Sequence, residues 1–101
     1  MAVHELQTPL VSIIMNCYNG DKYLEEAIDS IYAQTYSNWE IIFWDNQSTD
    51  KSKEIFQEFT DNRFKYHLSD KHTFLYEARD LAIKSSNGNF FISISVNNNL
   101  A

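Results

Sequence analysis

The chain has 101 residues, of which 44% are hydrophobic and 15% aromatic, so it is long enough for one small domain with a hydrophobic core. Its formal net charge of −6 excludes the broad basic surface that binding to duplex nucleic acid requires. The single cysteine, Cys17, excludes an intramolecular disulfide and a metal site built from cysteines.

The first nine residues, MAVHELQTP, are expected to form a disordered lead, and residues 10–101 are expected to form a single domain. This lead lacks a cationic region followed by an apolar run, so it does not have the pattern of a signal peptide. No apolar stretch approaches the roughly 20 residues that span a bilayer. We therefore expect a cytoplasmic protein without a transmembrane segment, and one free thiol fits a reducing compartment.

Residues 10–34 have the pattern of a buried strand followed by an amphipathic helix. The run LVSIIM, within residues 10–16, is short, apolar and rich in β-branched residues, which is typical of a central parallel strand. A turn at residues 19–21 leads into the helix. A helix over residues 21–34 would place four apolar side chains on one face, at i, i+3, i+4 and i+7: Leu24, Ala27, Ile28 and Ile31.

A second strand is predicted over residues 40–44, and it ends abruptly in Asp45. Ser48 or Thr49 is expected to cap the helix that follows, with Asp50 in its first turn. That helix would turn three apolar side chains inward: Ile55, Phe56 and Phe59.

The same alternation continues to the end of the chain. A short third strand is predicted over residues 64–67, and a third helix over residues 74–86 with Ala78 and Ala82 on its apolar stripe. Asn87 and Gly88 predict the stop of this helix, with Gly88 in the left-handed conformation. The run FFISIS, residues 90–95, predicts a fourth strand.

The predicted order of elements is therefore β-α-β-α-β-α-β. Strands that are joined through helices pair in parallel by right-handed crossovers, which puts helices on both faces of the sheet. The sequence thus predicts an α/β fold of the three-layer, Rossmann-like type with a mainly parallel sheet.

Polar residues follow the first two predicted strands at the points where they end. Asn16, Cys17 and Tyr18 follow the first strand, and Asp45 and Asn46 follow the second. Ligands of open α/β sheets bind at the carboxyl ends of the strands. The two strand ends therefore predict half of a nucleotide pocket, in which Asp45 could accept a hydrogen bond from the N3–H of uracil or from a ribose hydroxyl.

Five separated segments occur in an order and spacing that resemble glycosyltransferase family 2, the inverting, nucleotide-sugar-dependent enzymes of the GT-A type. They are PLVSIIMNCYN, SIYAQT, EIIFWDNQSTD, ARDLAIKSSNG and FFISISVNN. The resemblance covers about residues 9–94. It implies that residues 10–101 are the N-terminal, nucleotide-binding half of such an enzyme in truncated form.

The resemblance implies a role at the nucleotide for each residue of the two strand ends. Asp45 matches the acidic residue that contacts the base in the family, and Asn46 stands where the family has a second aspartate. Cys17 and Tyr18 match the turn whose backbone and aromatic ring flank the base. Asn16 stands where the family usually has proline. Each of these five residues is therefore a candidate for binding the nucleotide.

The later motifs of the family match less completely. Arg79 matches the arginine of the family's A-R-N segment and could offset the charge of a diphosphate, whereas Asp80 replaces the asparagine. Read without the resemblance, Arg79 is a solvated helix residue paired with Asp80 or Glu77. His67 and His72 are interpreted as surface or structural residues.

The fourth strand end carries the largest departure from the family. The family's D-x-D-D motif, whose carboxylates hold Mn²⁺ or Mg²⁺, falls on four residues that carry no charge: Ser95, Val96, Asn97 and Asn98. Hard divalent cations prefer anionic oxygen ligands. We therefore expect no metal site here and no catalytic residue in this chain, although the parent family uses Mn²⁺ or Mg²⁺.

Three functions are compatible with these residues to different degrees. The first is the sugar-nucleotide-binding part of a family 2 enzyme that transfers a sugar to an acceptor hydroxyl, inactive on its own. The second is a degenerate module that binds nucleotide weakly or forms a homodimer through an exposed sheet edge. The third is a phospho-receiver-like domain, which lacks its acidic pair after the first strand and its fifth strand here.

Overall fold

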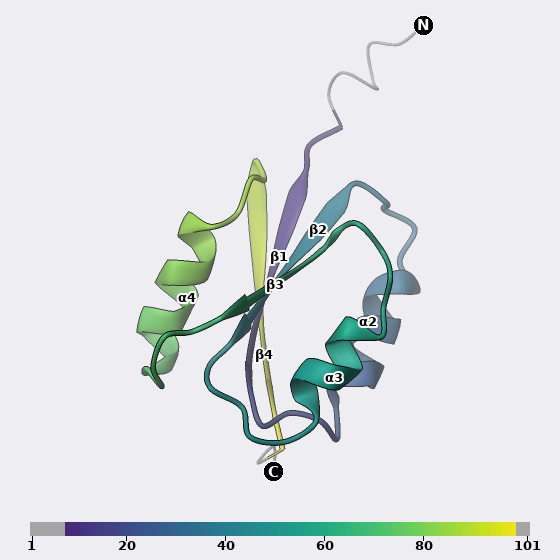
Figure 1. Ribbon diagram of the computed structural model, residues 1–101. Coiled ribbons are helices and arrows are strands. Elements are labelled where there is room, and N and C mark those ends of the chain that lie inside the picture. The colour runs from purple at the N-terminus through teal and green to yellow at the C-terminus, as the bar shows by residue number, and fades with distance from the viewer. Residues whose placement is uncertain (1–7, 99–101) are drawn as a thin grey trace, which may run out of the picture.

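The computed structural model describes residues 8–98 and shows one sheet flanked by helices (Figure 1). The elements, in chain order, are β1 (Val11–Tyr18), α2 (Leu24–Tyr32), β2 (Trp39–Asp45), α3 (Ser52–Gln57), β3 (Phe64–Leu68), α4 (Leu75–Lys84) and β4 (Phe90–Asn97). The predicted order of strands and helices is confirmed. Residues 1–7, most of the predicted lead, lie outside the described residues.

The four strands form one sheet in the order β3-β2-β1-β4, and all three pairings are parallel. Helices α2 and α3 lie on one face and α4 on the other, as Figure 1 shows. The predicted three-layer α/β fold with a parallel sheet is therefore confirmed. Within residues 8–98, no helix has the length and apolar content needed to cross a bilayer.

Alternation along β1 and β2 sorts their side chains between the two faces. Ile13, Met15 and Phe43 pack with α2 and α3, and the Phe43 ring stacks on Phe56 with centroids 4.2 Å apart. Ile14 and Ile42 face α4, where Ala82 is buried against them. Full burial of each large apolar side chain contributes about 1.5–3 kcal/mol. A central strand buried on both faces explains why β1 reads as a continuous apolar run.

The start of α3 differs from the prediction. The helix begins at Ser52 without a side-chain cap, so the prediction that Ser48 or Thr49 caps it is wrong. Ser48 instead accepts a hydrogen bond from the backbone N–H of Asn19, 3.0 Å away. The Asp50 carboxylate accepts from the N–H groups of Ser52 and Asp21. These polar side chains therefore join the turn after β1 to the turn after β2.

Gly88 also serves a different purpose from the one predicted. It does not have a positive φ, so the expected left-handed helix stop is wrong. A Cβ at this position would lie 2.8 Å from the carbonyl oxygen of Leu10 and would meet the Ser12 side chain. Glycine is therefore required because the turn before β4 lies directly against the start of β1.

The carboxylate of Glu40 is buried on the α4 face, with only 3% of the residue exposed. It accepts hydrogen bonds from the Ser12 hydroxyl at 2.6 Å and the Asn87 backbone N–H at 2.7 Å. Lys65 of β3 lies 3.3 Å away, and Ser12 in turn accepts from the N–H of Gly88. Burial alone would raise the pKa of Glu40, but these hydrogen bonds outweigh it and lower that pKa.

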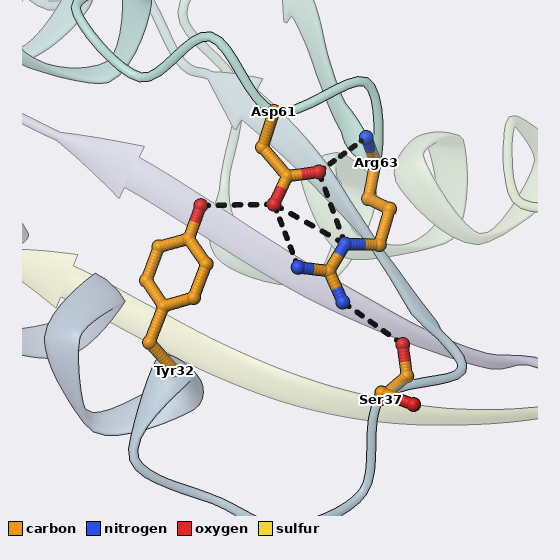
Figure 2. Close-up of polar contacts among 4 residues, drawn as sticks. All are labelled: Tyr32, Ser37, Asp61 and Arg63. Carbon is orange, nitrogen blue, oxygen red and sulfur yellow. Dashed lines mark hydrogen bonds and ion pairs between the residues drawn. The ribbon is translucent and has the colours of Figure 1, made fainter.

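A second polar cluster ties the amino ends of the strands together (Figure 2). Asp61 accepts hydrogen bonds from two nitrogens of the Arg63 guanidinium, at 2.7 and 3.0 Å, and from the Tyr32 hydroxyl at 3.0 Å. Arg63 also donates to the Ser37 carbonyl and lies over the Trp39 ring. Hydrogen bonding to Arg63 holds the pKa of Asp61 well below its usual range. This cluster stabilises the end of the sheet where β2 and β3 begin.

We predict that Glu40→Gln lowers the free energy of unfolding at pH 7 by about 1–3 kcal/mol, because the charge-assisted hydrogen bonds are lost. The folded-state pKa of Glu40 lies below its unfolded value near 4.3, so its contribution is full above that pH and disappears as the pH falls through the folded pKa. Urea unfolding at pH 7 and pH 3 measures both. Glu58→Gln, at an exposed position, is the matched control; equal losses at both pH values would contradict the assignment.

Candidate functional site

The carboxyl edge of the sheet holds a cavity of about 370 Å³. Its walls come from the ends of β1 and β4, the turn after β2, and the loop that leads into α4. The lining residues are Asn16, Cys17, Tyr18, Asn46, His72, Thr73, Phe74, Ala78, Ser95, Val96 and Asn97. Four of the six sequence-predicted site residues therefore lie around one cavity, and Asp45 and Arg79 are not among the lining residues.

Cys17 and Asp45 lie opposite each other on neighbouring strands. Both point toward the face that α2 and α3 cover, where Cys17 belongs to the buried core. Burial raises the pKa of the Cys17 thiol, which keeps it protonated and makes it a poor nucleophile. Cys17 accordingly serves as a small buried hydrophobic residue, whose place at the end of β1 still brings it to the cavity wall.

The Asp45 carboxylate is 1% exposed, and both of its oxygens have protein partners. One oxygen accepts from the backbone N–H of Ser48 at 2.8 Å, and the other accepts from the Tyr66 hydroxyl at 2.6 Å. Burial, together with this hydrogen bond to Asp45, raises the pKa of Tyr66. Asp45 therefore shapes the turn after β2 and holds it against β3.

Asn16 lies one residue earlier on β1 and so points to the opposite face, toward α4. Only 5% of it is exposed, yet it lines the cavity. Neither the nitrogen nor the oxygen of its side-chain amide has a hydrogen-bond partner among the described residues. Buried amides are nearly always paired, so this is the most unusual polar group of the cavity.

Asn46 positions the loop that closes the cavity on the side of α4. Its side chain pairs with the backbone of Thr73 through two hydrogen bonds, one donated at 2.7 Å and one accepted at 2.9 Å. The His72 ring contacts the Asn46 carbonyl through Nδ1 and meets the Tyr18 ring edge-on, with centroids 4.5 Å apart. Tyr18 and His72 thus form an aromatic wall.

The loop residues His72, Thr73 and Phe74 belong to the cavity wall, although no sequence motif points to them. His72, for which the sequence predicts a surface or structural role, is exposed and packs on Tyr18. The contact that brings this loop to the cavity joins Asn46 to Thr73 across 27 positions of sequence. No local pattern predicts such a pair.

Arg79 follows the lining residue Ala78 on α4 and is half-buried. The structure therefore places the guanidinium-bearing helix beside the cavity without making Arg79 part of its wall. Its predicted role at a diphosphate stays a prediction.

The sequence model of the family described as Glycosyl transferase family 2 matches residues 12–95. The chain belongs to glycosyltransferase family 2. It is 37% identical over 81 residues to the Escherichia coli protein WfgD, described as a UDP-Glc:alpha-D-GlcNAc-diphosphoundecaprenol beta-1,3-glucosyltransferase. It is also 37% identical over 82 residues to the glycosyltransferase GlyA of Streptococcus pneumoniae.

These matches cover most of the chain but a minor part of each relative. They take in 80% of this chain and 32% of WfgD, and 79% of this chain and 12% of GlyA. The chain therefore spans at most about a third of the length of these two curated relatives.

Solved structures of glycosyltransferases share the fold. The mannosyltransferase PcManGT of Pyrobaculum calidifontis, solved with GDP-Man and Mn²⁺, superposes with a TM-score of 0.79 at 22% identity, over 86% of this chain and 27% of that one. TarS of S. aureus with UDP-GlcNAc superposes with a TM-score of 0.78 at 24% identity, over 84% and 26%. At these identities the likeness shows the GT-A, Rossmann-like fold alone.

The end of β4 and the residue after it carry the positions on which the resemblance places the D-x-D-D motif. Asn98 donates a hydrogen bond to Asp21 at 2.8 Å and lies 3.4 Å from Asp50. Its side-chain oxygen accepts from the backbone N–H of Lys22. Asn98 therefore holds two carboxylates together and joins the end of β4 to the turn after β1.

The side chains at this strand end do not fit a divalent cation. Ser95 and Asn97 offer neutral oxygens, and the Asn98 amide is engaged with the Asp21–Asp50 pair. Within residues 8–98, no group of three or more His, Cys, Asp and Glu side chains could hold a metal ion. Mn²⁺ and Mg²⁺ prefer anionic oxygen ligands, so the donor set present here is a poor one.

We predict that Asn98→Asp destabilises the domain by about 1–3 kcal/mol at pH 7, because a third carboxylate replaces the amide that donates to Asp21 and Asp50. Asn98→Ala removes the same hydrogen bonds without adding charge and is the control. Urea unfolding in low and high salt measures the difference. A variant with aspartate that is as stable as the alanine variant would show that charge repulsion is unimportant.

Proposed function

We propose that residues 10–101 form one nucleotide-binding domain of a family 2 glycosyltransferase. The cavity at the carboxyl edge would receive the nucleoside diphosphate of a sugar donor. The proposed binding residues are those of the two strand ends and α4: Asn16, Cys17, Tyr18, Asp45, Asn46 and Arg79. Asp45 would act through the turn that it shapes and not by contact with the base. The observation that carries the proposal is the 370 Å³ cavity between β1 and β4, lined by four of these residues. Ligands of this fold class bind at that edge.

The ligand class follows from the chemistry of the family. Family 2 enzymes use nucleotide sugars, and PcManGT and TarS have been solved with GDP-Man and UDP-GlcNAc. We therefore propose UDP or GDP, free or sugar-linked, as the ligand. A cytoplasmic location is part of the same proposal.

We further propose that this chain binds the donor without transferring the sugar. Transfer requires a general base that deprotonates the acceptor hydroxyl and a group that stabilises the leaving diphosphate. No carboxylate is among the residues that line the cavity in the described part of the chain. The aspartates nearest the strand ends, Asp45, Asp21 and Asp50, are engaged in hydrogen bonds that join the turns.

Binding is expected to be independent of divalent metal, because the strand end of β4 supplies neutral oxygens. We predict that the dissociation constants of UDP and GDP change less than about threefold between 2 mM MnCl₂ and EDTA, in line with the weak ligand set. Isothermal titration calorimetry at constant ionic strength measures this. An affinity gain of tenfold or more with Mn²⁺ would show that the neutral strand end does bind metal.

The same preparation, supplied with UDP-glucose, UDP-GlcNAc or GDP-mannose and Mn²⁺, is expected to release no nucleoside diphosphate above the rate of the protein-free control. Release of UDP or GDP would contradict the proposal that the chain only binds.

A second candidate function rests on the edge strand β4. Phe90 and Phe91 are 63% and 55% exposed there, and Ile92 is exposed beside them. An apolar edge strand is a template for pairing with a second copy. Sedimentation velocity over a hundredfold range of concentration tests this homodimer, which predicts a sedimentation coefficient that rises with concentration.

A further inference from the structure

We propose that Asn16 binds the hydrogen-bonding edge of the donor's nucleobase, and that Asp45 does not. The inference rests on the proposed function, because it assigns the residue that recognises the base within the same cavity. The ligand chemistry is a planar ring edge with an N–H beside a C=O, as in uracil and guanine.

The Asn16 amide is buried without a hydrogen-bond partner among the described residues. This side chain is 95% buried, lines the cavity, and has neither a donor for its oxygen nor an acceptor for its nitrogen among the described residues. A buried amide without partners destabilises the protein that carries it. A ligand that supplies one donor and one acceptor in a single plane would satisfy both atoms at once.

The Asp45 carboxylate, in contrast, is already hydrogen-bonded within the protein. Its two oxygens already accept from Ser48 and Tyr66, and alternation along the sheet directs its side chain to the α2–α3 face. Asp45 is also 1% exposed and is not among the residues that line the cavity, so a base could reach it only if the buried turn opened. Asn16 points to the other face, on which α4 lies, and needs no such rearrangement.

The aromatic wall formed by Tyr18 and His72 lies in the same cavity as Asn16. Tyr18 follows Asn16 by two positions on β1, so the two side chains leave the same face of the strand about 6.5 Å apart. Tyr18 is 40% exposed and is held by the edge of His72. A base stacked on the Tyr18 ring would bring its polar edge to Asn16, because a pyrimidine ring and its substituents span a similar length.

The uracil and guanine edges complement the carboxamide. The Asn16 oxygen accepts from N3–H of uracil or N1–H of guanine, while the Asn16 nitrogen donates to the adjacent carbonyl oxygen. Methylation of that ring nitrogen removes the donor and adds bulk at the contact. It therefore offers a chemical test that leaves the protein unchanged.

The first experiment compares the full chain with Asn16→Leu, a variant of similar shape without polar atoms. We expect the melting temperature of the variant to rise, by an amount on the order of 4–8 °C, since a buried unpaired amide is removed. The affinity for UDP and GDP is expected to fall about tenfold or more. A residue with a merely structural role would instead lower the melting temperature. Asn62→Leu, at an exposed turn, is the control for both measurements.

The second experiment compares UDP with N3-methyl-UDP, and GDP with N1-methyl-GDP. We expect methylation to weaken binding to the unchanged chain about tenfold and to have little effect on the Asn16→Leu variant, whose contact is already lost. Asn16→Ser, which is smaller and polar, serves as a second variant in case the leucine variant does not fold. The nucleotide whose binding is weakened by methylation, UDP or GDP, identifies the base that the cavity binds.

The outcomes separate this inference from the function on which it rests. If neither UDP nor GDP binds to the unchanged chain, the proposed function is wrong and the inference falls with it. If a nucleotide binds equally well to the unchanged chain and to both Asn16 variants, the function stands and the inference is wrong. Equal binding of methylated and unmethylated nucleotide would also overturn it.

Discussion

The buried carboxylate of Glu40 is the contact on which the arrangement of the strands depends. It accepts from Ser12 on β1 and from the turn before β4, and it pairs with Lys65 on β3, so one side chain on β2 reaches all three partners. A charge at this depth is tolerated only because its oxygens are paired. Loss of one partner would weaken the compensation of this buried charge, so the contacts of a single side chain link β2 to β1, to β3 and to the turn before β4.

This arrangement decides which side chains can meet at the opposite, carboxyl edge. Because β4 pairs with β1, the neutral residues Ser95 and Asn97 come to the side of Asn16, and the loop before α4 closes over them. Alternation then separates Asn16 and Tyr18 from Cys17 and Asp45. The lining of the cavity consequently contains no carboxylate among the described residues, and the carboxylates of Asp21, Asp45 and Asp50 join the turns instead.

Apolar runs and helical periodicity were sufficient to predict the strands, the helices and the parallel sheet of residues 8–98. The runs of β1 and β2 reflect burial on both faces, whereas β4 was predicted from an apolar run whose Phe90, Phe91 and Ile92 are exposed. The caps and turns were predicted less well. Ser48 and Thr49 were predicted to be helix caps, but both contact Asn19 in the turn after β1. Gly88 was predicted to be a left-handed helix stop, but it lies against the start of β1. His72 and Thr73 were missed for the same reason, because they are joined to the cavity by Asn46 and Tyr18, which are distant from them in sequence.

The Asn98 amide stands where the resemblance places a carboxylate of the family, and this difference changes the charge at the end of β4. An aspartate at position 98 would place further negative charge beside Asp21 and Asp50, whose carboxylates already converge on Asn98. The Asn98 amide compensates these two carboxylates by donating hydrogen bonds to both. For the proposed nucleoside diphosphate ligand, a strand end with neutral oxygens offers a poor metal site, so we expect the base to contribute a larger share of the affinity. An unpaired amide at Asn16, next to an exposed aromatic ring, is the kind of group from which that share can come.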